Sequence, residues 1–290
     1  MRRSRIARHF AQNHFMNVAP TEVRALSDAE KFRFDTEGYL VLENFLSPDH
    51  VSRLLDTLDR TIARRRERVR TKQRQTGLTH LKSDKSSRLF YILDDDPLFL
   101  ELLDWPAIMP YVYGLLDTTR PHHCASDAIV EHGSDFLDRK GEWHIDGHDN
   151  GFRNLKHPIP LLQLKVGYYL SDMTAPWQGN LAVIPGSHHA LTEPSNEDRQ
   201  RRDFFPGVTQ VCAPAGTAIL FHNALWHTAA PYSGPDRGRT MLYYAYEHPW
   251  MIASEEHWGY TKDFYNHRLS TAQRKFFHGF LFDPPEQRWG

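Results

Sequence analysis

The sequence predicts a mainly β protein with flanking helices, built around a sandwich, jelly roll or barrel. Helix-forming patterns dominate up to about residue 117, and from about Ala125 the chain changes to short apolar runs separated by Gly, Pro, Asn and Asp. Such runs between turn residues are typical of antiparallel strands in a β core. No internal repeat or low-complexity linker divides the 290 residues, so we expect residues 27–290 to form a single domain after a basic, flexible tail at residues 1–26.

Two N-terminal helices have clear start signals. Ser27 and Glu30 form a capping box, so a helix should begin there. Ser47, Pro48 and Asp49 place a cap, a first-turn proline and an acid in that order. The helix that follows repeats apolar residues at helical spacing and should bury one face, formed by Val51, Leu54, Leu55, Leu58 and Ile62.

Other elements are expected from shorter patterns. A helical section at residues 91–117 is interrupted by prolines, and a second capping box spans Ser270 to Gln273. Apolar runs predict strands at residues 39–42, 161–170, 181–184, 217–221 and 239–246. Together these elements place a helical flank on a β core.

The composition excludes several classes of partner and scaffold. The formal net charge is -1, so nothing pulls the whole chain toward nucleic acid or an anionic membrane. No segment approaches the roughly 20 apolar residues that span a bilayer. Cys124 and Cys212 lie far apart without a CxxC pair, which favours a reducing compartment over a disulfide scaffold or a cysteine zinc site. We expect a cytoplasmic protein, monomeric or weakly dimeric, that binds a small-molecule substrate and neither nucleic acid nor membrane.

Two basic stretches allow more than one interpretation. Residues 1–10 have no apolar core behind them, which excludes a secretory signal, and we favour a frayed tail over an organelle transit peptide. Residues 64–74 hold six arginines and one lysine against Glu67. This run could bind an anion such as a phosphate-bearing substrate, but a solvated helix end or mobile loop is the favoured interpretation.

His144 and Asp146 form the sharpest chemical signal in the chain. Residues two apart on a strand point to the same face, so these side chains should project together. His227 lies 83 residues after His144, just past the apolar run at residues 217–221. A second histidine from another strand would complete the facial triad that binds iron(II) in non-haem oxygenases and leaves positions open for other ligands. The pattern predicts His144, Asp146 and His227 as metal ligands and catalytic residues.

Three other histidines compete with this assignment. His222 ends the strand before His227 and is the main alternative for the distal ligand. His148 continues the spacing of two from His144, but the glycine before it should end the strand. His188 most simply stabilises the turn that the preceding Pro-Gly begins. We keep His227 as the distal ligand, a choice over His222 that rests on what the family resemblance described below implies.

Arg239 follows His227 by 12 residues and begins the predicted strand at residues 239–246. Alternation along that strand places four side chains on one face: Arg239, Met241, Tyr243 and Ala245. A basic residue on an otherwise apolar or aromatic strand is costly to bury unless it is paired, and a carboxylate is the natural partner of a guanidinium group. The pattern predicts that Arg239 binds a carboxylate.

Several short motifs occur together along the chain. They are Trp-His-x-Asp at residues 143–146, Pro-Gly-Ser-His at residues 185–188, and His227 with a downstream arginine. In this combination the sequence resembles the phytanoyl-CoA dioxygenase family of iron(II)- and 2-oxoglutarate-dependent oxygenases. The stretch before the Pro-Gly-Ser-His motif is also similar, although the family usually has Asn-Gly where this chain has Gly-Asn. With a similar N-terminal pattern, the resemblance covers most of residues 27–247.

The resemblance implies a double-stranded β-helix, a cupin-like jelly roll with the metal inside. It also implies iron(II), 2-oxoglutarate and O2, with Arg239 holding the distal carboxylate of 2-oxoglutarate. Arg237 is the alternative, because the family's arginine usually falls at a spacing between these two. Gln163 and Lys165 share one face of the predicted strand at residues 161–170, and one of them could also contact 2-oxoglutarate. For Lys165, a side chain that points to solvent is an equal alternative.

The resulting hypothesis is a dioxygenase that hydroxylates an unactivated C–H group of a small organic or acyl substrate and releases succinate and CO2. Asp146 favours hydroxylation, since related halogenases lack that carboxylate, but desaturation and ring closure use the same triad. Two alternatives stay open: a cupin-like metal enzyme that does not use 2-oxoglutarate, and a non-catalytic metal-binding jelly roll. Arg239 argues against both, because neither needs a buried guanidinium group there. The identity of the substrate does not follow from the fold.

Overall fold

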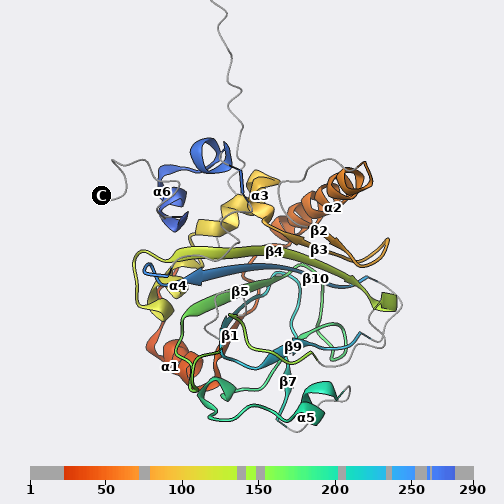
Figure 1. Ribbon diagram of the computed structural model, residues 1–290. Coiled ribbons are helices and arrows are strands. Elements are labelled where there is room, and N and C mark those ends of the chain that lie inside the picture. Colours follow the sequence, from red (N-terminus) through yellow and green to blue (C-terminus); the bar gives the residue numbers. More distant parts are fainter. Residues whose placement is uncertain are drawn as a thin grey trace, which may run out of the picture.

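The computed structural model describes residues 23–71, 79–135, 142–147, 154–201, 207–232, 237–251, 260–261 and 263–277. Two antiparallel sheets face one another, and helices cover the outer side of the larger sheet (Figure 1). The larger sheet has seven strands in the order β1-β8-β5-β10-β4-β3-β2, and the smaller has three in the order β7-β6-β9. The prediction of a mainly β fold with flanking helices and a jelly-roll core is confirmed.

The strands of the two sheets are short except at the centre of the larger one. The larger sheet consists of β1 (Tyr39–Leu42), β8 (Ala218–His222), β5 (Gln163–Tyr169), β10 (Arg237–Glu247), β4 (His122–His132), β3 (Ser87–Phe90) and β2 (Thr79–Leu81). The smaller sheet consists of β7 (Thr209–Gln210), β6 (Leu181–Val183) and β9 (His227–Ala229). The five predicted strands are confirmed to within two residues at each end. The strands β2, β3, β4, β7 and β9 have no counterpart among them.

The strand β10 lies at the centre of the larger sheet, between β4 and β5. Its predicted alternation is confirmed. Met241 and Tyr243 belong to a hydrophobic cluster shared with the smaller sheet, whereas Leu242 and Tyr244 belong to the cluster under the helices. The strand begins at Arg237, so Arg239 lies inside it and not at its start. Arg239 lies in the register irregularity between Arg237 and Thr240, where β10 pairs with β4, and its side chain projects between the two sheets.

Most helices flank the larger sheet, and one short helix lies beside β7 of the smaller sheet (Figure 1). The α-helices are α1 (Asp28–Glu37), α2 (Pro48–Arg70), α3 (Pro97–Glu101), α4 (Met109–Leu116), α5 (Asn196–Gln200) and α6 (Thr271–Arg274). Short turns of 3-10 or π helix are η1 (Ile92–Asp94), η2 (Leu102–Asp104), η3 (Gly133–Asp135), η5 (Ser187–His189), η7 (Phe264–Arg268) and η8 (Lys275–Phe277). The helical section at residues 91–117 is confirmed, and Pro97 and Pro110 lie in the first turns of α3 and α4, where proline leaves no needed donor unpaired.

The predicted helix caps explain where α1, α2 and α6 begin. Ser27 and Glu30 form the reciprocal capping box of α1. The side chain of Ser47 accepts a hydrogen bond from the amide of His50 at the start of α2. Ser270 and its partner repeat the capping box at α6. One side of α2 is buried with the outer side of the larger sheet, and it carries Val51, Leu54 and Leu58.

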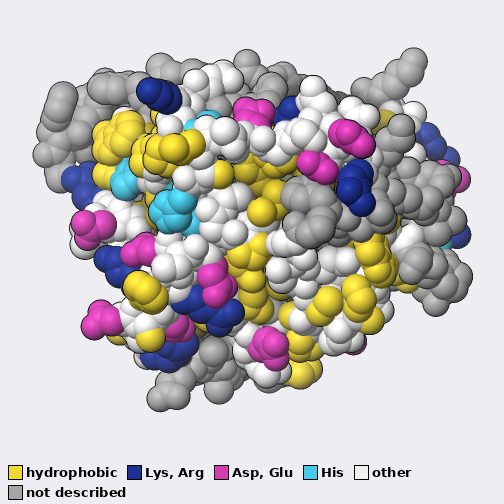
Figure 2. Space-filling view, turned by 90° about the horizontal axis from the view of Figure 1, so that it is seen from below, with side chains coloured by type: hydrophobic (Ala, Val, Ile, Leu, Met, Phe, Trp, Pro, Cys, Tyr) yellow, Lys and Arg dark blue, Asp and Glu magenta, His cyan; other side chains and the backbone are white. Residues whose placement is uncertain are grey.

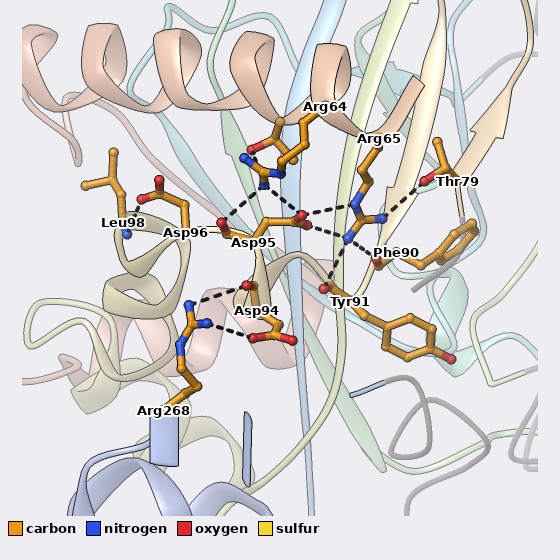
Figure 3. Close-up of polar contacts among 11 residues, drawn as sticks. Arg64, Arg65, Thr79, Phe90, Tyr91, Asp94, Asp95, Asp96, Leu98 and Arg268 are labelled. Atoms are coloured by element: carbon orange, nitrogen blue, oxygen red, sulfur yellow. Dashed lines mark hydrogen bonds and ion pairs between the residues drawn. The ribbon is translucent and has the colours of Figure 1, made fainter. Parts of the chain in front are cut away.

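The basic run at residues 64–74 is partly built into the protein interior. Arg65 is 1% exposed, pairs with the Asp95 carboxylate and donates to two backbone carbonyl groups. Arg64 donates to the same carboxylate at 2.9 Å (Figure 3). The favoured interpretation, a solvated helix end or mobile loop, is therefore wrong for Arg65, because a buried cation is stable only when it is paired. Residues 72–74 lie outside the described part of the chain.

The surface of the described residues agrees with a protein of balanced charge. On the face shown in Figure 2, acidic and basic side chains are interspersed among hydrophobic ones, and neither sign gathers into one large patch. No helix in the described ranges is both long and apolar enough to cross a membrane. Residues 1–22, which make up most of the predicted tail, lie outside the described residues. The tail and the single domain at residues 27–290 stay predictions.

Candidate active site

Backbone pairing brings His144 and His227 together. His227 opens β9, and its amide donates to the carbonyl of His144 at 3.0 Å, while the amide of His144 donates to the carbonyl of His227 at 3.1 Å. Residues that exchange both bonds across an antiparallel pair project their side chains to the same side. The two imidazole centroids lie 4.3 Å apart. Two main-chain hydrogen bonds thus join residues that are 83 positions apart in the sequence.

Asp146 joins this pair from a bend two residues after His144. Its amide donates to the carbonyl of Asn223 at 2.8 Å. The prediction that His144 and Asp146 lie on one strand holds only locally, because His144 forms an isolated bridge. One ligand atom from each of His144, Asp146 and His227 nevertheless lies within 4.8 Å of the others. The structure therefore brings the three predicted metal ligands together.

The tautomers of both histidines are fixed by carbonyl groups. Nδ1 of His144 lies 2.8 Å from the carbonyl oxygen of Glu142, and Nδ1 of His227 lies 2.8 Å from that of Leu225. A carbonyl oxygen only accepts, so each Nδ1 must carry the proton. Each Nε2 then keeps a free lone pair, as a metal-binding histidine requires.

The two oxygens of the Asp146 carboxylate have different neighbours. Oδ1 accepts a hydrogen bond from Lys165 Nζ at 3.1 Å. Oδ2 is buried without a hydrogen-bond partner among the described residues and lies 3.9 Å from His227 Nε2. An orphaned buried oxygen is costly unless something else satisfies it. With two free imidazole nitrogens beside it, this donor set fits a divalent metal ion such as iron(II).

Burial and charge set the protonation states that a metal site needs. Burial and the neighbouring His144 lower the pKa of His227 to about 3, and burial also lowers the pKa of His144. Burial raises the pKa of Asp146, but the Lys165 ammonium and the two histidines outweigh it and lower that pKa to about 2. At neutral pH the site therefore offers two neutral imidazoles and one carboxylate, which is the form that binds metal.

Arg239 reaches the same space from β10 and is 5% exposed. Its Nε lies 3.1 Å from Met241 Sδ, and its Nη2 donates to the hydroxyl of Tyr243. Its Nη1 lies 3.7 Å from Oε2 of Glu131 on β4. The guanidinium group is thus buried between the sheets near a carboxylate of the protein, and it can serve a second carboxylate from a ligand.

Gly179 explains how the backbone approaches Arg239 so closely. A Cβ atom at Gly179 would lie 2.8 Å from Cβ of Arg239, and the residue has φ +81°, which side chains rarely adopt. Asn180, the next residue, donates through Nδ2 to the carbonyl of Met173 at 2.8 Å and so fixes this turn. The packing against Arg239 therefore explains the glycine at position 179.

The three converging residues and Arg239 line one cavity of about 120 Å³ between the sheets. Its wall also carries Lys82, Arg88, Asp127 and Glu131, which were not among the predicted site residues. A signal for two of them exists in the sequence, because Asp127 and Glu131 alternate with Ile129 at inward spacing along β4. Recognising it requires knowing that β4 is a strand of the core.

Lys165 and Gln163, the two further predicted cosubstrate contacts, have different surroundings. Lys165 lines the cavity and points to Asp146, so the alternative of a side chain directed to bulk solvent is wrong. Gln163 is buried, and its Nε2 donates to Glu247 Oε1 at 3.0 Å and contacts Cys124 Sγ at 3.1 Å. Gln163 is not among the residues that line the cavity. Contact of either residue with 2-oxoglutarate stays a prediction.

The competing histidines and arginine have other places. His222 is buried at the end of β8, where its Nδ1 accepts a hydrogen bond from the amide of Ala224 at 2.9 Å. His188 packs on His222 with ring centroids 4.9 Å apart, and its Nε2 lies 3.1 Å from the carbonyl oxygen of Asp35. Neither lines the cavity. His148 and the side chain of Arg237 lie outside the described part of the chain.

Comparison with known families agrees with this geometry. The profile of the phytanoyl-CoA dioxygenase (PhyH) family matches residues 34–241. The chain belongs to this family. As a phytanoyl-CoA dioxygenase family member it is a non-haem iron dioxygenase that depends on 2-oxoglutarate, and its cofactors are those predicted from the sequence. No sequence among curated proteins matches the chain.

Solved structures of similar fold cover most of this family member. HygX from Streptomyces hygroscopicus with iron bound has 18% identity and a TM-score of 0.61, covering 79% of this chain and 89% of HygX. EctD from S. alaskensis with 2-oxoglutarate and 5-hydroxyectoine has 23% identity and a TM-score of 0.61, covering 79% of each chain. The carbocyclase SnoK from nogalamycin biosynthesis has 19% identity and a TM-score of 0.58, covering 87% of this chain and 94% of SnoK. At these identities the likeness supports the fold.

Proposed function

We propose that His144, Asp146 and His227 bind iron(II) on one face and that Arg239 binds the distal carboxylate of 2-oxoglutarate. The enzyme hydroxylates an unactivated C–H group of a small organic substrate and releases succinate and CO2. The observation that carries this proposal is the convergence of two Nε2 atoms and Asp146 Oδ2 in a cavity that also contains a buried guanidinium group. Neither a plain metal store nor a zinc hydrolase requires that guanidinium group.

The residues of the chain would share the work in the following way. Bound iron and 2-oxoglutarate supply O2 activation coupled to oxidative decarboxylation. The carbonyl groups behind His144 and His227 hold both rings in the ligating tautomer. Asp146 offsets part of the metal charge, and Lys165 holds the carboxylate so that Oδ2 faces the histidines. Arg239 orients the cosubstrate, which costs less when the donor is fixed in advance.

The apolar part of the cavity wall would keep water away from the reaction. Leu181, Phe221 and Ala229 line the cavity together with the histidines. Phe221 contacts His227 edge to face, with ring centroids 4.9 Å apart. A wall of this kind raises the strength of the ionic contacts inside the cavity, because the local dielectric falls.

The decisive experiment measures O2 consumption and succinate release by the purified protein. Both should require iron(II) and 2-oxoglutarate together, and the anaerobic complex should show a metal-to-ligand absorption band. Activity with zinc or manganese but without 2-oxoglutarate would instead select the cupin-like alternative. Metal binding with neither O2 consumption nor succinate would select the non-catalytic jelly roll.

The substrate class, the cellular location and the oligomeric state are also proposals. Structural neighbours include HygX with hygromycin B bound and EctD with 5-hydroxyectoine bound. Both ligands are small organic molecules. We extend only that size and class to this chain. Among the described residues, Cys124 and Cys212 form no disulfide, which supports the proposed cytoplasmic location. A monomer or weak homodimer is the proposed state in solution.

A further inference from the structure

The larger sheet continues past the proposed iron and 2-oxoglutarate sites into a second group of charged residues. Arg239 belongs to β10, and the next strands outward are β4 and β3. On these strands Asp127, Glu131 and Arg88 line the cavity, and Lys82 lines it just beyond β2. The proposed function uses none of these four side chains to hold iron or 2-oxoglutarate. They form the wall that remains for a substrate.

Arg88 is held in place but keeps donors available. Its Nη2 donates to Asp127 Oδ2 at 2.7 Å, and its guanidinium group lies over the Phe90 ring, 4.5 Å from the centroid. Its side chain is 40% exposed. Among the described residues, Nη1 has no hydrogen-bond partner, and Nε is buried without one. A guanidinium group fixed by stacking and one ion pair is suited to bind a carboxylate with its remaining donors.

Asp127 offers the opposite charge beside it. Its side chain is 5% exposed, and its Oδ2 accepts from Arg88. No described residue donates to its Oδ1, and the residue lines the cavity. A carboxylate can accept several hydrogen bonds at once. The pair therefore presents a donor and an acceptor of opposite charge side by side.

The charges on the cavity wall balance. Four basic side chains line it, Lys82, Arg88, Lys165 and Arg239, and four acidic ones, Asp127, Glu131, Glu142 and Asp146. The two positive charges of iron(II) and the two negative charges of 2-oxoglutarate cancel when both are bound. A substrate with a net charge would thus bring an unbalanced charge into a partly buried space, which is costly. A long apolar chain would leave the charged wall desolvated without partners.

We propose that the Arg88–Asp127 pair is the substrate-binding subsite and that the substrate is a small zwitterion, with its carboxylate on Arg88 and its cationic nitrogen near Asp127. The inference rests on the proposed function and names the substrate class of the same cavity. Each charge of the substrate then meets a side chain of opposite sign, and the total charge of the filled cavity stays unchanged. Selection is against neutral and singly charged molecules of similar size.

The test uses the iron(II)-loaded enzyme with 2-oxoglutarate and a defined panel of molecules. The panel holds free amino acids, cyclic amino acids and betaines, each matched with its carboxamide and its decarboxylated amine, together with fatty acids and acyl-CoA thioesters. The readout is a 2-oxoglutarate-dependent mass gain of one oxygen, followed by kcat and KM for every oxidised compound. Succinate release without any panel member is measured separately, because it tests the proposed function alone.

Variants then connect the preference to Arg88. We expect Arg88→Met to lower kcat/KM for the oxidised zwitterion by at least about 10-fold, mainly through KM, but to change little for its carboxamide, since each change removes the same ionic contact. Arg88→Lys keeps the charge without the fork and should rescue part of the loss, and it also guards against a folding defect in Arg88→Met. Arg33, an exposed arginine of α1 whose side chain is 57% exposed, supplies the matched control Arg33→Met.

The outcomes separate the two proposals. Preferential oxidation of zwitterions, with kcat/KM lowered to a similar degree by the carboxamide replacement and by Arg88→Met, supports the inference. Succinate release by the wild type, combined with oxidation of acyl-CoA thioesters or of neutral amides in preference to zwitterions, overturns the inference and leaves the proposed function standing. Succinate release with no panel zwitterion oxidised also overturns it. An absence of succinate release would overturn the proposed function itself.

Discussion

Lys165 Nζ lies 3.1 Å from Asp146 Oδ1, so that Asp146 keeps only Oδ2 free and that atom faces His227 Nε2 at 3.9 Å. Lys165 comes from β5 in the larger sheet, whereas Asp146 lies on a segment held by Asn223. The ion pair thus ties the loop that carries one proposed ligand to the rigid sheet behind it. It also decides which carboxylate oxygen the metal can reach.

We expect Lys165→Met to weaken iron(II) binding by about 10- to 100-fold, the usual cost of losing a group that orients a metal ligand. Anaerobic iron(II) or cobalt(II) titration measures this. Lys165→Gln retains a donor and should lose less, and Lys31→Met on exposed α1 should match the wild type. Tighter metal binding in Lys165→Met would show that the ammonium acts only by opposing the metal charge.

Replacing any proposed iron ligand should abolish turnover. His144→Ala, Asp146→Ala and His227→Ala each remove a donor atom and leave a site that no longer fixes the metal. His222→Ala should keep activity, because the His222 ring bonds to a backbone amide away from the cavity. Succinate release with saturating iron(II) is the measurement. Loss of activity in His222→Ala together with an active His227→Ala would move the distal ligand to His222.

Arg239→Ala should lower the affinity for 2-oxoglutarate by about 10- to 150-fold, because hydrogen bonds to charged groups contribute about 1.5–3 kcal/mol. Arg239→Lys should fall between the wild type and Arg239→Ala, since lysine keeps the charge but not the fork. Iron(II) affinity should barely change. Titration of the anaerobic iron(II) enzyme, followed by its absorption band, gives both values.

The neighbouring arginine is the matched control for this experiment. Arg237→Ala should leave 2-oxoglutarate affinity near the wild-type value. A large loss in Arg237→Ala with none in Arg239→Ala would transfer the role by two residues and keep the family mechanism. Equal 2-oxoglutarate affinity in the wild type, Arg237→Ala and Arg239→Ala would mean that neither arginine holds the cosubstrate.

His222 should make the folded state sensitive to mild acid. Burial lowers the pKa of His222 to about 3, against an ordinary histidine value of 6.5. Between these values the unfolded chain binds a proton that the folded chain excludes, so stability falls as pH drops from 6.5, by up to about 1.4 kcal/mol per pH unit for one group. His222→Asn removes this titration, and its side-chain oxygen can still accept from the amide of Ala224. Urea unfolding at pH 7, 6 and 5 should give a shallower pH dependence for His222→Asn, and parallel curves would contradict the assignment.

Local signals predicted the elements that are long or capped. The capping box at Ser27 and the cap and proline at Ser47 and Pro48 placed α1 and α2, because these interactions involve residues only a few positions apart. Alternation predicted the two faces of β10. The strands β2 and β9 have three residues each, which is too short for a period of two to stand out from chance. Their structure is decided by the strands beside them.

In the candidate site, too, local patterns could be predicted, whereas contacts between distant segments could not. The spacing of His144 and Asp146 predicted a shared direction, and His227 was chosen over His222 partly through the family resemblance. The partner of Lys165 could not be predicted, because it depends on a loop folding back over β5. Arg65 was misjudged for a related reason. Its run of like charges indicated a solvent-exposed helix end. Asp95 comes 30 residues later and lies beside Arg65 only because α2 packs against the chain before α3.

A metal ion bound by His144 and His227 would cross-link the two ends of the chain segment between them, where their backbones already pair. Separating these two residues, which are 83 positions apart, would require breaking two main-chain hydrogen bonds and the metal contacts in the same event. Only the closed form holds the ion, so occupancy stabilises it, by about 2.7 kcal/mol when free metal is 100 times the Kd. The lifetime of the protein in a cell would then follow the iron supply, because the ion-free chain opens more often and is removed sooner by proteases.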